Sequence, residues 1–468
     1  MKLGGSSLAD AACLRHAFEL VAAALERAPL VVLSAMGKTT DALFRAARAA
    51  ERGDADIALA EAAAIHARHR DAIEALFPEG TPLPLLAALD ELRAELELLL
   101  RGVALLRELS PRSLDAIAGH GERLSTLVFA HYVRERDVDC ELFDARTVIR
   151  TDASFGGAQP DVAAIRALAH ERLAPRLAPG RCVVTQGYIG GTVLGFPTTL
   201  GRGGSDYSAS LFGAGLGADE VQIWTDVEGV LTADPRVIPA ARPIAELSFD
   251  EAAELAAFGA KVLHPATIQP AVDAGVPVSV RHTMRPAGRF TWIRARRPND
   301  LSSAAPVTRR PVTALASRGP ISVLTLTSTR MFNQSGYLAR VFEVFGRLGV
   351  SVDLIATAEV SVSCTVEPDA PLQALAAELS RFATVAIAQE RAIVAIVGAR
   401  MKDTPGLVGR VFAALGDIAP ELISMGGNEI NLSIVVPAAH SHEALRRLHR
   451  AFFEAHEPAS SHDPEVEA

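Results

Sequence analysis

The chain has 468 residues, which at roughly 100–200 residues per domain suggests two to four domains. Hydrophobic residues make up 49% of it and charged residues 22%, the usage of an ordinary globular protein, which excludes wholesale disorder. There are 46 Lys and Arg residues against 55 Asp and Glu residues, a formal net charge of -9. This balance argues against DNA or RNA as a partner and requires that any polyphosphate be bound by locally placed cations and amides.

The cysteines and the N-terminus indicate the compartment. Cys13, Cys140, Cys182 and Cys364 are scattered without paired spacing, so neither a disulfide framework nor a CxxC metal site is predicted. The N-terminus lacks a basic region followed by an apolar stretch, and no apolar run reaches the roughly 18–20 residues that cross a bilayer. We therefore expect a cytoplasmic protein without a membrane partner.

The first 290 residues alternate short β-rich runs with helical stretches. Apolar and β-branched residues gather at 30–33, 182–185 and 221–225, as in buried strands. Between about 50 and 130 the chain is rich in Ala, Leu, Glu and Arg, with apolar residues at helical spacing, which predicts a helical block. The alternation predicts a three-layer α/β domain over residues 1–290.

The remainder of the chain contains a weak repeat. Residues 291–312 have little periodicity and several Pro and Arg residues, which predicts a linker. Beyond it, 336–342 and 406–412 share the pattern Gly-x-x-x-Arg-Val-Phe, and each lies between two β-rich runs. The last residues are acidic and contain proline, as disordered segments do. We expect two α+β domains and a disordered tail, at 313–385, 386–457 and 458–468.

Two glycine-rich segments have the composition of anion-binding loops. Lys2, Gly4 and Gly5 stand where a strand would meet a helix, so that backbone amides, the helix N-terminus and an ammonium group would be available to phosphate. Residues 198–206 place three glycines around Arg202 before a second helical pattern. The first segment alone is equally compatible with a capped turn, whereas the glycine density of the second favours ligand binding over a plain turn.

A third segment follows the β-rich run that ends at Thr225. In open α/β sheets, ligands bind outside the carboxyl ends of the strands, where Thr225 and Asp226 would lie. By itself this segment is also compatible with a strand followed by two turns.

Five segments share their order and spacing with one known family. They lie at 34–41, 121–125, 201–206, 225–236 and 258–265. Together they resemble the aspartate kinases, a family of the amino-acid kinase superfamily, and the C-terminal repeats look like the paired ACT regulatory domains of that family. The resemblance implies ATP-dependent phosphorylation of the side-chain carboxylate of L-aspartate to 4-phospho-L-aspartate, the first step of lysine, threonine and methionine biosynthesis.

The resemblance also implies a nucleotide site that takes ATP with Mg2+. Lys2, a catalytic residue, and the amides of Gly4 and Gly5 would contact the β- and γ-phosphates. Only Met1 precedes Lys2, where the family has several residues of strand, so we expect a shortened first strand or a start upstream of Met1. Leu231 stands where the family often has tyrosine and cannot donate a hydrogen bond to the nucleotide. The rest of the pocket would be formed by Thr225, Asp226, Leu231, Arg236, Lys261 and Val262.

For the acceptor, the resemblance assigns Arg202 to the α-carboxylate of aspartate and Glu122 to its ammonium group. Asp206, the second catalytic residue, would orient Lys2 or receive Mg2+ through water, and both roles stay open. The aspartate side chain has a pKa near 3.9 and is already ionised at neutral pH, so no general base is needed. Mg2+ would be bound mainly by phosphate and water rather than by a dedicated metal site. Further contacts to aspartate would come from Thr40, Gly203, Gly204 and Ser205.

The first C-terminal repeat resembles the effector site of lysine-sensitive members. A diamino acid carries two ammonium groups, which Asp353 and Glu359 would pair, so L-lysine is the expected feedback inhibitor. Gln334 and Ala358 replace serines often seen in the lysine-sensitive pattern, which leaves threonine open as an effector. ACT-like units commonly pair, so a homodimer or a dimer of dimers is expected. The predicted effector residues are Met331, Ser335, Tyr337, Leu338, Val352, Asp353, Glu359 and Val360.

Two alternatives remain at this point. The first is a kinase of another substrate, because acetylglutamate and uridylate kinases share similar glycine loops although they lack the paired ACT-like tail. The second is a catalytically inactive amino-acid sensor, against which the retained Lys2, Glu122, Arg202 and Asp206 argue. A coupled assay with ATP and aspartate separates them.

Overall fold

The computed structural model describes residues 1–259, 265–295, 311–332, 334–399, 401–427 and 429–454. These residues divide into two compact units. The first contains residues 1–230 and 243–249 and the described residues between 265 and 295. The second contains residues 231–242 and 250–259 and the described residues from 311 onward. No helix among the described residues is long and apolar enough to cross a membrane.

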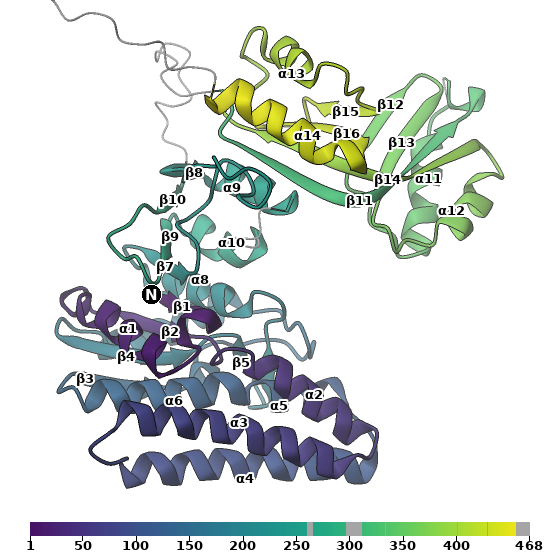
Figure 1. Cartoon of the computed structure of the whole chain (residues 1–468). Helices are drawn as coiled ribbons and strands as arrows, with labels where there is room; N and C mark the ends of the chain where they lie inside the picture. The colour runs from purple at the N-terminus through teal and green to yellow at the C-terminus, as the bar shows by residue number, and fades with distance from the viewer. Residues whose placement is uncertain (260–264, 296–310, 333, 400, 428, 455–468) are drawn as a thin grey trace, which may run out of the picture. The chain divides into compact units, whose positions relative to one another are not determined.

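The first unit is built on an eight-stranded sheet of order β3-β4-β2-β1-β7-β9-β10-β8 (Figure 1). In this spatial order, the neighbouring strands from β3 through β4, β2, β1 and β7 to β9 are parallel. β10 runs antiparallel to β9. A separate hairpin pairs β5 (Ile189–Gly191) with β6 (Pro197–Thr199). The sheet strands are β1 (Lys2–Leu3), β2 (Leu30–Leu33), β3 (Asp139–Phe143), β4 (Arg181–Gln186), β7 (Val221–Thr225), β8 (Glu246–Ser248), β9 (Val278–His282) and β10 (Thr291–Arg294).

Helices cover both faces of this sheet. Val31 and Leu33 of β2 are buried with residues of α1, α3, α4 and α6 in one core, while α8 packs on β1, β2 and β7 and in turn contacts α7 and α10. The long α3 and α4 pack together, and α4 packs on α6 (Figure 1). The helices are α1 (Ala11–Ala22), α2 (Thr39–Glu51), α3 (Ala55–Leu76), α4 (Leu83–Leu106), α5 (Pro111–Ala118), α6 (His120–Arg134), α7 (Val162–Leu168), α8 (Gly204–Leu216) and α10 (Pro265–Asp273).

Local sequence explains where several of these helices begin. The side chain of Asp10 accepts a hydrogen bond from the Cys13 amide and caps α1, and Ser110 caps α5 in the same way, with Pro111 in its first turn. Gly203, at φ +72°, lets the chain enter α8 in a left-handed conformation that a side chain disfavours. The α/β class and the helical block between about 50 and 130 are confirmed.

The second unit contains a six-stranded antiparallel sheet of order β12-β13-β11-β14-β16-β15. The first half has a core around Leu324, Val341 and Leu375. The second half has a core around Val394 and Leu432. The elements are β11 (Ala314–Thr327), α11 (Tyr337–Arg347), β12 (Ile355–Ala358), β13 (Ser361–Val366), α12 (Leu372–Leu379), β14 (Thr384–Val397), α13 (Leu407–Leu415), β15 (Leu422–Met425), β16 (Asn431–Pro437), α14 (Ala438–His449) and, in part, α9 (Phe249–Ala257).

The two halves of this sheet are not simply consecutive in the chain. β11 and β14 are long strands that pair with each other through both halves, so the start of β11, near Ala314, lies in the second half beside the end of β14. Residues 231–242 also join this unit: Ala233 and Ile238 are buried in the core of the second half, and the Leu315 amide donates to the Thr232 carbonyl (2.8 Å). The predicted domain limits do not anticipate either feature.

Candidate active site

A cavity of about 580 Å3 opens in the first unit, at the carboxyl ends of the central strands. Two of its walls are the glycine-rich loops predicted to bind anions, which follow β1 and β6, and a third wall is α6. The residues that line it are Lys2, Gly5, Ser34, Ala35, Gly37, Thr40, Asp41, Phe44, Glu122, Gly156, Tyr188, Gly201, Arg202, Gly203, Gly204, Ser205 and Asp206.

The centre of the cavity is an ion pair between Lys2 and Asp206, with 2.7 Å between the Lys2 Nζ and the Asp206 Oδ1. Lys2 lies on β1 between β2 and β7, and Asp206 lies in the first turn of α8. Both side chains are largely buried, yet both line the cavity. Since a lysine ammonium has three donors, one ion pair leaves it able to bind a further anion.

Glu122 is a buried carboxyl on the first turn of α6. Its Oε1 accepts a hydrogen bond from the Ala35 amide (3.1 Å), and its Oε2 has no partner among the described residues. Burial raises the pKa of Glu122 to about 8, although the Ala35 hydrogen bond and the nearby Lys2 oppose the rise. A buried acceptor without a partner at a cavity wall is suited to a ligand that brings a cation or a hydrogen-bond donor.

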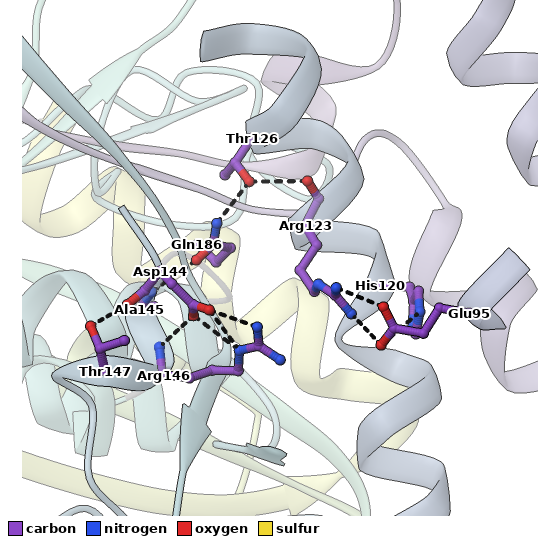
Figure 2. Close-up of polar contacts among 9 residues, drawn as sticks. All are labelled: Glu95, His120, Arg123, Thr126, Asp144, Ala145, Arg146, Thr147 and Gln186. Atoms are coloured by element: carbon purple, nitrogen blue, oxygen red, sulfur yellow. Dashed lines mark hydrogen bonds and ion pairs between the residues drawn. The ribbon is translucent and has the colours of Figure 1, made fainter. Parts of the chain in front are cut away.

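Polar contacts of Thr126 and Arg123 fix the position of α6 (Figure 2). Thr126 accepts a hydrogen bond from the Gln186 Nε2 (3.0 Å), and the Gln186 Oε1 accepts one from the Ala145 amide (2.9 Å), so α6 is tied to β4 and to the segment after β3. Arg123 forms a two-pronged ion pair with Glu95 of α4, at 2.7 and 2.8 Å (Figure 2). The helix that carries Glu122 is therefore held from two directions.

Close backbone approach explains two of the glycines. A Cβ atom on Gly5 would lie 2.9 Å from the Ala35 carbonyl oxygen, so the first loop can contact the 34–37 segment only as glycine. A Cβ on Gly187 would lie 2.7 Å from the Ser205 Cβ. The Gly4 amide donates to the Trp224 carbonyl (3.3 Å), so it is engaged in this structure rather than free for phosphate.

The structure brings most of the predicted residues together but separates some. All of the predicted aspartate-binding residues line the cavity, as do Lys2, Gly5 and Asp206. Thr225 and Asp226 lie at the end of β7 in the same unit, and the Thr225 carbonyl accepts from the Thr283 amide. Of the other predicted nucleotide residues, Leu231 and Arg236 belong to the second unit, and Lys261 and Val262 lie outside the described residues.

Sequence reasoning missed several residues that line the cavity. Gly156 and Tyr188 were not predicted, although Gly156 precedes Gly157 and Tyr188 lies between Gly187 and Gly190. Tyr188 adopts φ +66°, which is unusual outside glycine and not visible in the sequence. Ser34 and Asp41 belong to the segment 34–41, whose resemblance to the family could have indicated that they line the site.

Comparisons with known proteins identify the family. The model of the amino acid kinase family matches residues 1–282, and an ACT domain model matches residues 324–377 and 394–452. Lysine-sensitive aspartokinase 3 of Escherichia coli is 39% identical over 97% of this chain and 98% of its own length. The chain belongs to the aspartokinase family. It is an aspartate kinase, and neither an inactive sensor nor a kinase of another carboxylate is favoured.

Solved structures support the same assignment for this aspartokinase. Escherichia coli aspartokinase III in complex with aspartate and ADP, in the R-state, is 37% identical, covers 97% of this chain and 99% of that chain, and has a TM-score of 0.80. The same enzyme in complex with lysine and aspartate, in the T-state, is 38% identical, covers 97% and 98%, and has a TM-score of 0.77.

The predicted effector residues of this aspartokinase gather in the first half of the second unit. Met331, Tyr337 and Val352 pack on one core, the Ser328 amide donates to the Val360 carbonyl, and the Tyr337 hydroxyl is buried without a hydrogen-bond partner among the described residues. Ser335, Leu338 and Glu359 are exposed. Asp353 forms an ion pair with Arg318 (3.2 Å), which also contacts Glu367.

Proposed function

We propose that the cavity around Lys2 and Asp206 is where this aspartokinase transfers the γ-phosphoryl group of ATP to the side-chain carboxylate of L-aspartate. The observation that carries the proposal is the charge arrangement of one cavity: a buried carboxyl with a free oxygen at Glu122, a guanidinium at Arg202 and an ammonium at Lys2. Free aspartate has an ammonium group and an α-carboxylate, which Glu122 and Arg202 complement, and Lys2 remains for the transferring phosphoryl group.

The proposed mechanism needs alignment and charge stabilisation rather than acid-base chemistry. The attacking carboxylate is already ionised at neutral pH. Arg202 would bind the α-carboxylate through its planar fork, and Glu122 would bind the ammonium, which leaves the side-chain carboxylate pointing toward Lys2. Lys2 would stabilise the charge on the transferring phosphoryl group, and Asp206 would hold its ammonium in place.

ATP would be bound with Mg2+, which supplies charge neutralisation on the phosphates. Among the described residues there is no group of three His, Cys, Asp or Glu side chains placed to hold a metal ion. The donors of this site therefore fit an ion that is bound largely by phosphate and water, with Asp206 as a carboxylate available through water. We assign the phosphates to Lys2 and Gly5, and the remaining nucleotide contacts to Thr225 and Asp226.

Regulation by L-lysine is part of the proposal. The most similar relatives include a lysine-sensitive aspartokinase, and Asp353 and Glu359 would pair the two ammonium groups of lysine in the first half of the second unit. Pairing of such units between chains would make the protein a homodimer or a dimer of dimers. Light scattering with and without lysine reports both the assembly and its response.

A coupled ATPase assay with aspartate tests the proposal, and the Lys2→Ala variant tests its central residue. We expect turnover to fall by about 100-fold or more, as for the loss of one preorganised transition-state contact, while the KM for aspartate changes little. Lys38 is an exposed residue of a neighbouring loop and does not line the cavity, so Lys38→Ala is the matched control. Near-normal turnover in Lys2→Ala would remove Lys2 from the mechanism.

A further inference from the structure

Asp115 is a buried carboxyl of α5 that does not line the cavity but contacts two segments that do. It is 2% exposed and accepts four hydrogen bonds. Its Oδ2 accepts from the amides of Gly156 (2.9 Å) and Thr199 (3.0 Å). Its Oδ1 accepts from the Thr199 hydroxyl (2.7 Å) and, at 3.1 Å, from the Gly156 amide. No arginine, lysine or histidine is paired with it among the described residues.

These two contacts join the 152–159 turn to the loop that carries Arg202. Gly156 lines the cavity, and Thr199 is the last residue of β6, shortly before the cavity residues 201–206. The Ala158 amide donates to the Thr199 carbonyl (2.9 Å), and a Cβ on Gly201 would lie 3.5 Å from the Gly156 carbonyl oxygen. The two segments therefore touch, and Asp115 is bonded to both where they meet.

We propose that Asp115 is a positioning residue for the acceptor: it fixes the spacing between Gly156 and the Arg202 loop, and so the wall against which aspartate binds. The inference rests on the proposed function of the cavity. An isolated buried carboxylate is costly to maintain, and here two backbone amides and a hydroxyl offset that cost without a counter-ion. Such an arrangement stabilises one relative position of the two segments. Any other position is less stable, because moving one segment would leave a buried donor or acceptor without a hydrogen-bond partner.

The principal test is Asp115→Ala, which removes all four hydrogen bonds. We expect the KM for aspartate to rise about tenfold or more, the loss expected when hydrogen bonds to a charged group are removed. The KM for ATP is expected to stay within about twofold and kcat at saturating aspartate within about threefold, since Lys2 is untouched. A purely structural role would instead lower the melting temperature and leave the aspartate KM of the folded fraction unchanged.

Conservative variants sharpen the test. In Asp115→Asn, the amide oxygen can take the Oδ2 position and accept from both amides, while the amide nitrogen donates to the Thr199 hydroxyl, so most of the aspartate affinity should return. Thr199→Val removes the hydrogen bond from the Thr199 hydroxyl to Asp115, together with the contact of that hydroxyl with Tyr188, and should raise the aspartate KM by about threefold. If Asp115→Ala does not fold, Thr199→Val decides, and an unchanged aspartate KM there overturns the inference.

The matched control is Asp152→Ala, in the same turn. Asp152 accepts hydrogen bonds from the amides of Ser154 (3.0 Å) and Gln159 (2.9 Å) and is exposed, but it bonds nothing on the Arg202 loop. We expect unchanged kinetics. An equal rise in the aspartate KM of both variants would overturn the inference while leaving the proposed function intact. A wild-type chain that does not phosphorylate aspartate would instead remove the proposed function, and this inference with it.

Discussion

At the scale of single residues, the raised pKa of Glu122 makes aspartate binding dependent on pH. The pKa of this carboxyl is about 8 in the unliganded protein, so at neutral pH the protonated form predominates. Binding of an ammonium group beside it favours the carboxylate, so binding expels a proton at pH values between the lowered pKa of Glu122 in the complex and the raised pKa of the free protein. We expect the affinity for aspartate to rise by up to about tenfold per pH unit across that interval and to level off above the pKa of the free protein.

Calorimetry in two buffers of different ionisation enthalpy measures the released proton directly. Glu122→Gln, which keeps the size and cannot ionise, is the matched variant: it should bind aspartate weakly and without this pH dependence. A wild-type affinity that is flat from neutral pH to above the pKa of Glu122 would show that the ammonium binds elsewhere.

The same residue shows what the sequence can and cannot predict about the site. Lys2, Arg202 and Asp206 stand in glycine-rich loops whose composition predicts anion binding, and the fold brings Lys2 and Asp206 to 2.7 Å although they are distant in the chain. Glu122 was assigned by family resemblance, but its free oxygen and its burial depend on how α6 packs. Asp115 carries no sequence signal, because a single aspartate on a short helix is usually solvated.

At the scale of elements, the cross-helix pair of Arg123 and Glu95 should stabilise the packing of α6 on α4. Its geometry is two-pronged, but the two side chains are 21% and 46% exposed, so solvent screens much of the attraction. We expect a contribution of about 0.5–1 kcal/mol, which corresponds to a loss of about 1–4 °C in melting temperature for Glu95→Gln. The aspartate KM should change little, because the Gln186 contact with Thr126 holds α6 independently.

A double-mutant cycle of Glu95→Gln with Arg123→Met isolates this pair. The control cycle uses Arg93 and Glu97, which form a single-pronged pair (2.7 Å) within α4 and should couple more weakly. A coupling energy no larger than that of the control would show that Arg123 contributes only through its packing.

Helices and strands could be predicted where the sequence pattern is local, but the pairing of strands that lie far apart in the chain could not. The repeat at 336–342 and 406–412 predicted two equivalent helices, and α11 and α13 both start after a glycine in the left-handed conformation, Gly336 and Gly406. The continuation of β11 and β14 through both halves of the sheet was not predicted, because a long β-rich run does not tell which partner each half will meet. The docking of residues 231–242 in the second unit likewise depends on distant contacts, such as the Thr232 hydroxyl with His449 (3.1 Å).

At the scale of the whole molecule, feedback inhibition requires that the effector favour one of two global arrangements, typically by a coupling free energy of about 1–3 kcal/mol. The second unit contains both the predicted effector residues and residues 231–242, in which the family resemblance places the nucleotide contacts Leu231 and Arg236. An effector that changes the packing of this unit would act on residues 231–242, which follow the proposed nucleotide contacts Thr225 and Asp226 closely in the chain. We expect lysine to lower activity together with a change in assembly that light scattering detects.

The carboxylates of the effector site make the prediction specific. Asp353 is already paired with Arg318, so an incoming ammonium group must compete for it, whereas Glu359 is exposed and has no ion pair among the described residues. We therefore expect Glu359→Ala to raise the lysine concentration for half-inhibition by about tenfold or more, the loss of one charge-assisted contact. Glu343→Ala, which removes an exposed acid of α11 in the same half, is the control and should leave inhibition unchanged. Activity titrated with lysine and with threonine completes the test, because threonine has one ammonium group and gains nothing from a second carboxylate. Inhibition by threonine alone, or lysine inhibition that survives Glu359→Ala, would contradict this assignment of the effector. Either outcome would leave the kinase assignment intact.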